Sequence, residues 1–175
     1  MKRCLLNSAL TEETSAGRKK VTSLSKYGAS ESASQELLAL IEKIHKNEVY
    51  DAIINYFFVL RFGKTMYNKH GLHKSKSNDY IRQKLRELGR LLVALRNTST
   101  IDSVKEAVKP SNFVTLIKAV KKVAGFDEAT GIYKSPSLAL KIGHSLRRVS
   151  ELIMCQFLMD EDDEGVKSIR RFHKL

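Results

Sequence analysis

NDYIRQKLRELGRLLVALRN, residues 78–97, is the stretch that decides the fold of this chain. Its apolar side chains recur at intervals of four, three, four and three residues, which is the spacing of one face of an α-helix. These residues are Ile81, Leu85, Leu88, Leu92 and Leu95. Asn78 or Asp79 supplies an oxygen for the first free backbone amides, as the first residue of a helix commonly does. The stretch predicts an amphipathic helix over 79–96 whose leucine face lies in the core.

Four arginines of the same stretch form a second stripe. At 100° per residue, this stripe lies roughly 120° from the apolar one. Its members are Arg82, Arg86, Arg90 and Arg96. The stripe indicates contact with an anionic partner, although exposed arginines also serve solubility alone. Gly89 lies among them without a Cβ, so it predicts a place where a neighbouring helix approaches closely.

The composition favours a single helical domain. A chain of 175 residues is long enough for one domain with tails, and its 42% of hydrophobic residues can fill a core. Two prolines and nine glycines are too few for the many turns of a sandwich or barrel. We therefore expect an all-α fold, a compact bundle of about five or six helices over residues 31–160. Residues 1–30 are expected to be a flexible basic arm, and residues 161–175 a charged flexible tail.

Apolar periodicity predicts helices on both sides of the opening stretch. Residues 49–67 are apolar around much of the helix circumference, so they predict the central helix of the core. Residues 68–77 predict a basic loop, and residues 126–135 a polar turn or small hairpin. The other predicted helices cover 34–46, 103–108, 110–125 and 136–159.

Several of these boundaries follow from single residues. Ser103 and Glu106, three residues apart, form a capping box at the start of a short helix. Pro110 suits the first turn of the next helix, because its φ is fixed and it has no N–H to donate. Gly125 is a natural helix end.

The formal charge of +12 is concentrated in the middle of the chain. Residues 61–96 contain ten lysines and arginines against two acidic residues, and residues 105–148 contain nine against three. A basic folded surface favours nucleic acid or an anionic membrane surface as partner. A basic helical protein without such a partner remains an alternative.

The chain predicts no disulfide framework and no membrane span. Cys4 and Cys155 lie far apart, which is typical of a protein in a reducing compartment. The apolar run at the start is too short for a signal peptide, and no run of about 18 apolar residues exists.

No arrangement of side chains predicts catalysis or a metal site. His144 and Arg147 lie on one helix face, but spacing of three has that result whatever the function. His70 and His73 lack the further ligands of a structural zinc site. The acidic run 160–164 lacks the alternation and glycine of a calcium loop. We expect no enzyme activity, no metal and no cofactor.

The basic surface remains as the candidate site. Together with the arginine stripe, basic residues of the 68–77 loop and of the helix over 110–125 can contact successive phosphates of a duplex. These additional residues are Lys69, Lys74, Lys76, Lys118, Lys121 and Lys122.

Three stretches resemble a group of mobile-element-derived vertebrate proteins found in fish-type genomes: LRFGKTMYNKHG (60–71), IRQKLRELGRLL (81–92) and the span 109–146. The resemblance covers about residues 46–155. Members of this group are longer, with a zinc-finger-like segment before the helical region and a long C-terminal part after it. Their helical region is similar to the core-binding (SAM-like) domain of tyrosine recombinases, which clamps DNA.

The resemblance implies a helical DNA-binding module rather than a recombinase. No tyrosine follows His144 and Arg147, so the catalytic set of a recombinase is incomplete. Cys4 stands where a last zinc ligand of the longer relatives would be, which implies a truncated copy without zinc binding. We expect double-stranded DNA as partner, nuclear localisation (otherwise cytoplasmic) and no membrane. The alternative is a helical interaction domain that forms a homodimer or binds an acidic protein.

Overall fold

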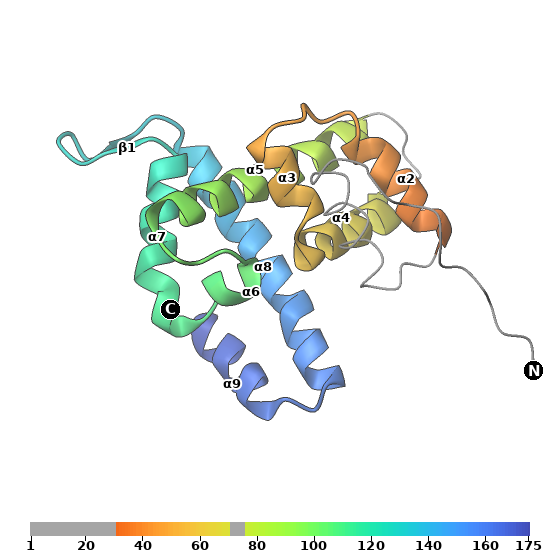
Figure 1. Ribbon diagram of the computed structural model, residues 1–175. Helices are drawn as coiled ribbons and strands as arrows, with labels where there is room; N and C mark the ends of the chain where they lie inside the picture. Colours follow the sequence, from red (N-terminus) through yellow and green to blue (C-terminus); the bar gives the residue numbers. More distant parts are fainter. Residues whose placement is uncertain (1–30, 71–75) are drawn as a thin grey trace, which may run out of the picture.

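The computed structural model describes residues 31–70 and 76–175, and the predicted arm over 1–30 lies outside them. Within the described residues the chain is largely helical, and two short strands form its only sheet (Figure 1). This confirms the all-α prediction. In chain order the elements are α2 (Glu31–Ile41), α3 (Glu48–Ile54), α4 (Phe57–His70), α5 (Lys76–Thr98), α6 (Val104–Ala107), η1 (Pro110–Asn112), α7 (Phe113–Val123), β1 (Phe126–Asp127), β2 (Ile132–Tyr133), α8 (Pro136–Met159) and α9 (Asp163–Phe172).

Helix α5, which contains the opening stretch, is the centre of the bundle. Helices α2, α3, α4, α7 and α8 all pack against it. The predicted leucine face is completely buried, with every member 0% exposed. Leu91, beside this face, is buried as well. Because neighbours cover so much of its circumference, α5 presents only a narrow strip to solvent.

Helix α3 approaches α5 closely at Gly89. A Cβ built on Gly89 would lie 2.8 Å from Val49 Cγ1 and 2.9 Å from the backbone oxygen of Val49. It would also lie 3.1 Å from Ile53 Cγ1. The predicted close approach of a neighbouring helix is therefore confirmed.

The predicted single helix over 49–67 is wrong, because two helices occupy that segment. Helix α3 ends at Ile54, Asn55 is its C-cap residue, and α4 begins at Phe57. One straight helix would have had to bury apolar side chains on several sides at once. The break lets α3 pack on α5 while α4 packs on both α5 and α8. The central helix is thus α5, not this segment.

The first helix is shifted towards the N-terminus relative to its prediction over 34–46. Helix α2 begins at Glu31 and ends at Ile41. Ile44 still reaches the core from the turn that follows, where its N–H donates a hydrogen bond of 2.8 Å to the carbonyl of Ile41. The end of the helix was therefore predicted too late, although the apolar stripe of the segment is buried.

The middle of the chain follows the predictions. Ser103 Oγ accepts a hydrogen bond of 3.2 Å from the N–H of Glu106 and caps α6. Pro110 opens the η1 turn that leads into α7, and Gly125 follows α7 with a φ of +67°. Residues 126–135 form a hairpin of two antiparallel strands.

The prediction of a flexible tail over 161–175 is also wrong. Helix α9 forms there and packs against α8 and η1 (Figure 1). Asp162 Oδ1 accepts a hydrogen bond of 2.8 Å from the N–H of Gly165 and caps this helix. Val166 and Ile169, which belong to this helix, are buried. The helical domain therefore extends through α9.

Replacing Ile169 by alanine should loosen α9, because the side chain is 2% exposed and its loss leaves a cavity. Truncation of a buried isoleucine typically costs about 2–5 kcal/mol. We expect limited proteolysis to cut the variant near residues 160–163 at concentrations that leave the wild type intact. Arg170→Ala, an exposed change in the same helix, is the control. Equal cleavage of all three proteins would contradict a docked α9.

Candidate nucleic-acid interface

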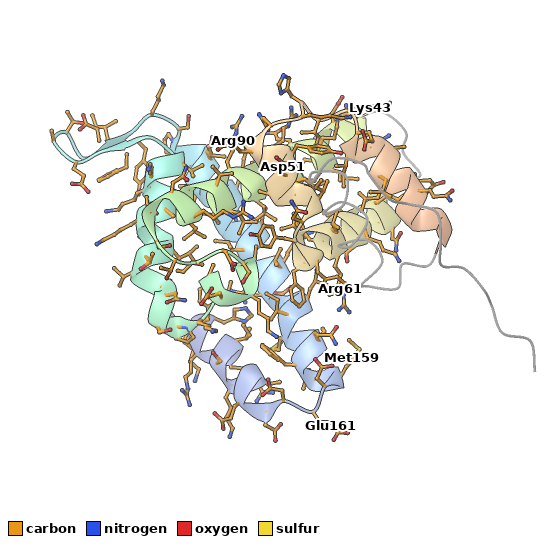
Figure 2. All side chains as sticks on the ribbon, viewed as in Figure 1. Lys43, Asp51, Arg61, Arg90, Met159 and Glu161 are labelled. Carbon is orange, nitrogen blue, oxygen red and sulfur yellow. The ribbon has the colours of Figure 1, made fainter. Side chains whose placement is uncertain are left out.

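The solvent-facing strip of α5 carries two open arginines. Arg86 and Arg90 are exposed and lie on the side opposite the leucine face. Figure 2 labels Arg90, whose side chain projects from α5 away from the core. Within the described part of the chain, neither guanidinium has an acidic partner. The other faces of α5 pack against neighbouring helices, so the backbone that carries these two arginines is held in place.

The other two arginines of the predicted stripe are held by side chains of the protein itself. Arg82 is half-buried and forms an ion pair with Asp79, one turn earlier. Arg96 lies with its guanidinium carbon 5.0 Å from the centre of the Tyr56 ring and donates hydrogen bonds to the Tyr56 hydroxyl. The stripe is thus not a uniform row of free cations.

Both ends of the segment predicted as a basic loop, residues 68–77, are helical. Lys69 is exposed but belongs to the last turn of α4, and Lys76 is the first residue of α5. Lys74 and the side chain of Lys76 lie outside the described residues. Lys69 is therefore an exposed helical residue. The positions of the Lys74 and Lys76 side chains relative to the arginines stay a prediction.

The lysines of α7 divide into two kinds. Lys118 and Lys122 are exposed. At 100° per residue, Lys118 lies roughly 160° from the buried Leu116 and so points away from the α5 side of the helix. Lys121 is half-buried, with its ammonium 4.4 Å from the centre of the Phe126 ring. An extension of the arginine strip by all three lysines is not seen.

A second group of basic side chains surrounds a hollow between α4, α5 and α8, which we call the α8 hollow. Its volume is about 670 Å³, and its lining includes two lysines and two arginines against one glutamate. These charged residues, together with one histidine, are Lys84, Lys141, His144, Arg147, Arg148 and Glu151. The buried side chains of Phe62 and Met66 form its apolar wall.

The sequence contained a signal for this hollow that the predictions missed. Lys141, His144 and Arg148 are spaced by three and four residues, which places them on one face of α8. The sequence prediction uses only His144 and Arg147 on this segment, and excludes them as a catalytic pair. The sequence of α8 alone does not indicate which other helices this face packs against, because that depends on tertiary packing.

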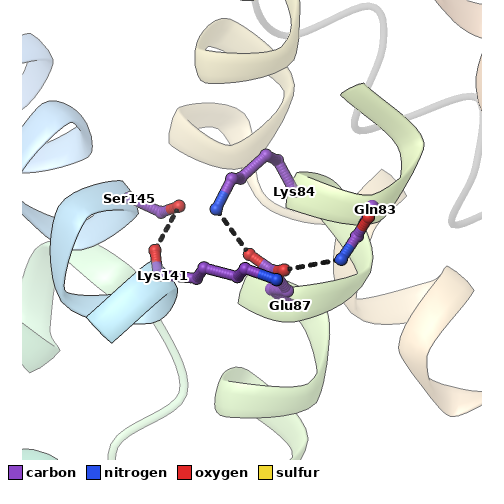
Figure 3. A network of polar contacts seen from close by, with 5 residues as sticks. All are labelled: Gln83, Lys84, Glu87, Lys141 and Ser145. Atoms are coloured by element: carbon purple, nitrogen blue, oxygen red, sulfur yellow. Dashed lines mark hydrogen bonds and ion pairs between the residues drawn. The ribbon is translucent and has the colours of Figure 1, made fainter. Parts of the chain in front are cut away.

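An ion pair lies at the inner edge of the hollow. Lys84 Nζ is 2.8 Å from Glu87 Oε2, and the two side chains are only 9% and 3% exposed. Gln83 Nε2 donates a longer hydrogen bond of 3.3 Å to the other carboxylate oxygen. Figure 3 shows this pair on α5 facing Lys141 and Ser145 on α8. Burying two charges is costly, so removing either partner would leave the other charge buried without compensation.

The structure groups no set of metal ligands among the residues that it describes. No three His, Cys, Asp or Glu side chains lie close enough there to hold an ion. His70 lies at the end of α4, whereas His73 and Cys4 are outside the described residues. Cys155 is an exposed free thiol on α8.

Comparisons with protein families, curated proteins and solved structures found no match for this chain. Nor is any helix in residues 31–70 and 76–175 long and apolar enough to cross a bilayer. The arrangement of charge on the helices is therefore the basis for a functional argument.

Proposed function

We propose that this chain is a non-enzymatic DNA-binding module that holds duplex DNA mainly through its phosphates. We propose further that it acts in the nucleus and derives from a mobile element, with a helical region like the core-binding domain of tyrosine recombinases. The observation that carries the binding proposal is the pair of open arginines on the rigid strip of α5. The resemblance of three sequence stretches to mobile-element-derived proteins, whose helical region is similar to a DNA-clamping domain, supports it.

The spacing of Arg86 and Arg90 suits a polyanion. Four residues of α-helix rise about 6 Å, which is close to the spacing of successive phosphates along one DNA strand. Both side chains are exposed and lack acidic partners among the described residues, so binding would not have to break an existing ion pair. Arginine also donates two parallel hydrogen bonds to a phosphate. Contacts of this kind position a protein on DNA without reading its sequence.

Replacing Arg86 and Arg90 together by glutamine should weaken binding to a random-sequence duplex. Each lost phosphate contact lowers the slope of log affinity against log salt by about 0.9. We therefore expect the slope to fall by about 2 units, measured by fluorescence anisotropy at several salt concentrations.

The matched control is Arg170→Gln with Arg171→Gln on α9. This double change removes the same charge from exposed positions on a helix that packs on α8 and η1. A purely global effect of net charge would make the two double variants equal. Unchanged affinity and slope in the α5 variant would overturn the role of the strip.

One observation favours the alternative of an interaction domain. Ile117 and Leu140, which are 39% and 68% exposed, line a groove of about 420 Å³ between α7 and α8. Val114 and Ile132 nearby in sequence are also largely exposed. Exposed apolar side chains that gather in one place commonly mark protein contacts. A stable dimer in sedimentation, combined with no duplex binding at low salt, would support this alternative against DNA binding.

A further inference from the structure

The α8 hollow differs from an ordinary basic surface because its charges line a recess between helices. Lys141, His144 and Arg148 approach it from α8, and Lys84 from α5. Part of its wall is apolar and buried, because Phe62 is 2% and Met66 3% exposed. Its lining carries two lysines and two arginines against one glutamate, and an excess of positive charge in a recess with low-dielectric walls concentrates anions.

Two of the cations are already paired. Lys84 forms the buried ion pair with Glu87. Arg147 lies 3.6 Å from Glu151 in an exposed pair, which water and salt screen. Among the described residues, Lys141 and Arg148 have no acidic partner. Both are exposed, so these two side chains are free to bind a ligand.

We propose that the α8 hollow is a binding site for a phosphate group, held chiefly by Lys141 and Arg148 with His144 beside them. A phosphate offers several acceptor oxygens, which an ammonium and a guanidinium on one helix face can both approach. The acidic partners of Lys84 and Arg147 keep the rest of the recess near neutrality, which leaves charge for one anionic group. The phosphate is either a free ion or part of a nucleic-acid backbone.

This site is separate from the α5 strip. Lys84 and Arg86 are two residues apart, so they project from α5 roughly 160° apart. The hollow therefore does not rest on the DNA-binding proposal, and each can fail without the other.

The test is a titration of the isotope-labelled full chain with sodium phosphate or pyrophosphate at constant ionic strength, followed by amide NMR. We expect saturable shifts of the amides of 141–151 in the wild type. Lys141→Gln with Arg148→Gln should weaken the fitted affinity by about tenfold or more, since it removes two charge-assisted hydrogen bonds. Both positions are exposed, so the fold should persist, which the unchanged dispersion of the remaining amides would verify.

The double variant of Arg170 and Arg171 is again the matched control, and it should bind phosphate like the wild type. Shifts that grow linearly without saturation would overturn the site. So would equal affinities of the hollow variant and the control variant.

Duplex binding by the same proteins distinguishes the two sources of phosphate. If the hollow holds a backbone phosphate, the hollow variant loses duplex affinity and slope, as the α5 variant does. If the hollow takes only the free ion, the hollow variant loses phosphate binding while its duplex binding is unchanged. If the hollow variant loses phosphate binding while the α5 variant keeps its duplex binding, the phosphate site in the hollow is supported. That result would overturn only the proposed role of the α5 strip in DNA binding.

Discussion

Replacing Glu87 by leucine is expected to destabilise the protein by about 3–5 kcal/mol, because it leaves the ammonium of Lys84 buried without its partner. Glu87 is 2% and Lys84 7% exposed, and their charged atoms lie 2.8 Å apart. Lys84 lines the α8 hollow, so its ammonium can rotate partly towards water. Because this rotation would partly hydrate the ammonium, we expect the loss of stability to lie at the lower end of the range. Urea denaturation followed by circular dichroism measures the change.

A double-mutant cycle shows whether the loss comes from the unpaired charge. Lys84→Met in the Glu87→Leu background removes the orphaned ammonium, and replacing a buried pair by apolar groups of similar volume is often close to neutral. We expect the double variant to recover most of the stability that Glu87→Leu loses. If the two single losses simply add, the pair is not coupled and the prediction fails.

The buried ion pair also shows a limit of sequence reasoning. The leucine face of α5 was predictable because its spacing fits one helix face and no other element. Lys84 and Glu87 lie beside that face and read as ordinary polar positions. Their burial depends on the packing of α4 and α8 against α5, which are contacts between distant parts of the chain.

The two segments that were predicted wrongly have different physical causes. Residues 49–67 are apolar on several sides, which fits a central helix as well as two helices that turn between Ile54 and Phe57. The C-terminal segment has the mixed charges typical of a tail, but the order of those charges along the segment fits a helix. Acidic residues lie in its first turn and basic residues in its last, where they complement the helix dipole.

The candidate site was predictable in kind but not in detail. Charge density identified α5 as a basic helix, and the structure leaves Arg86 and Arg90 open there. Arg82, in contrast, forms an ion pair with Asp79, and Arg96 packs over the ring of Tyr56. Tyr56 is 40 residues from Arg96 in the chain, so its cation–π contact has no local signal.

Replacing Gly89 by alanine should destabilise the protein, although alanine is the better helix former by about 1 kcal/mol. The added Cβ would lie 2.9 Å from the backbone oxygen of Val49, and backbone cannot rotate aside as a side-chain end can. Helix α3 would have to move away from α5, against which it packs. Overpacking of this kind costs about 1–3 kcal/mol, and Gly89→Val should cost more than Gly89→Ala.

Gly143→Ala provides the matched comparison, because both glycines lie within long helices and only their surroundings differ. A Cβ at Gly143 would meet no atom within 4 Å, and the position is exposed. There the helix propensity of alanine acts unopposed, so we expect a gain of about 0.5–1 kcal/mol. The same substitution should thus change the free energy of unfolding in opposite directions at the two sites. A gain at Gly89 similar to that at Gly143 would mean that α3 does not press against α5, and the packing of the bundle around α5 would need a different account.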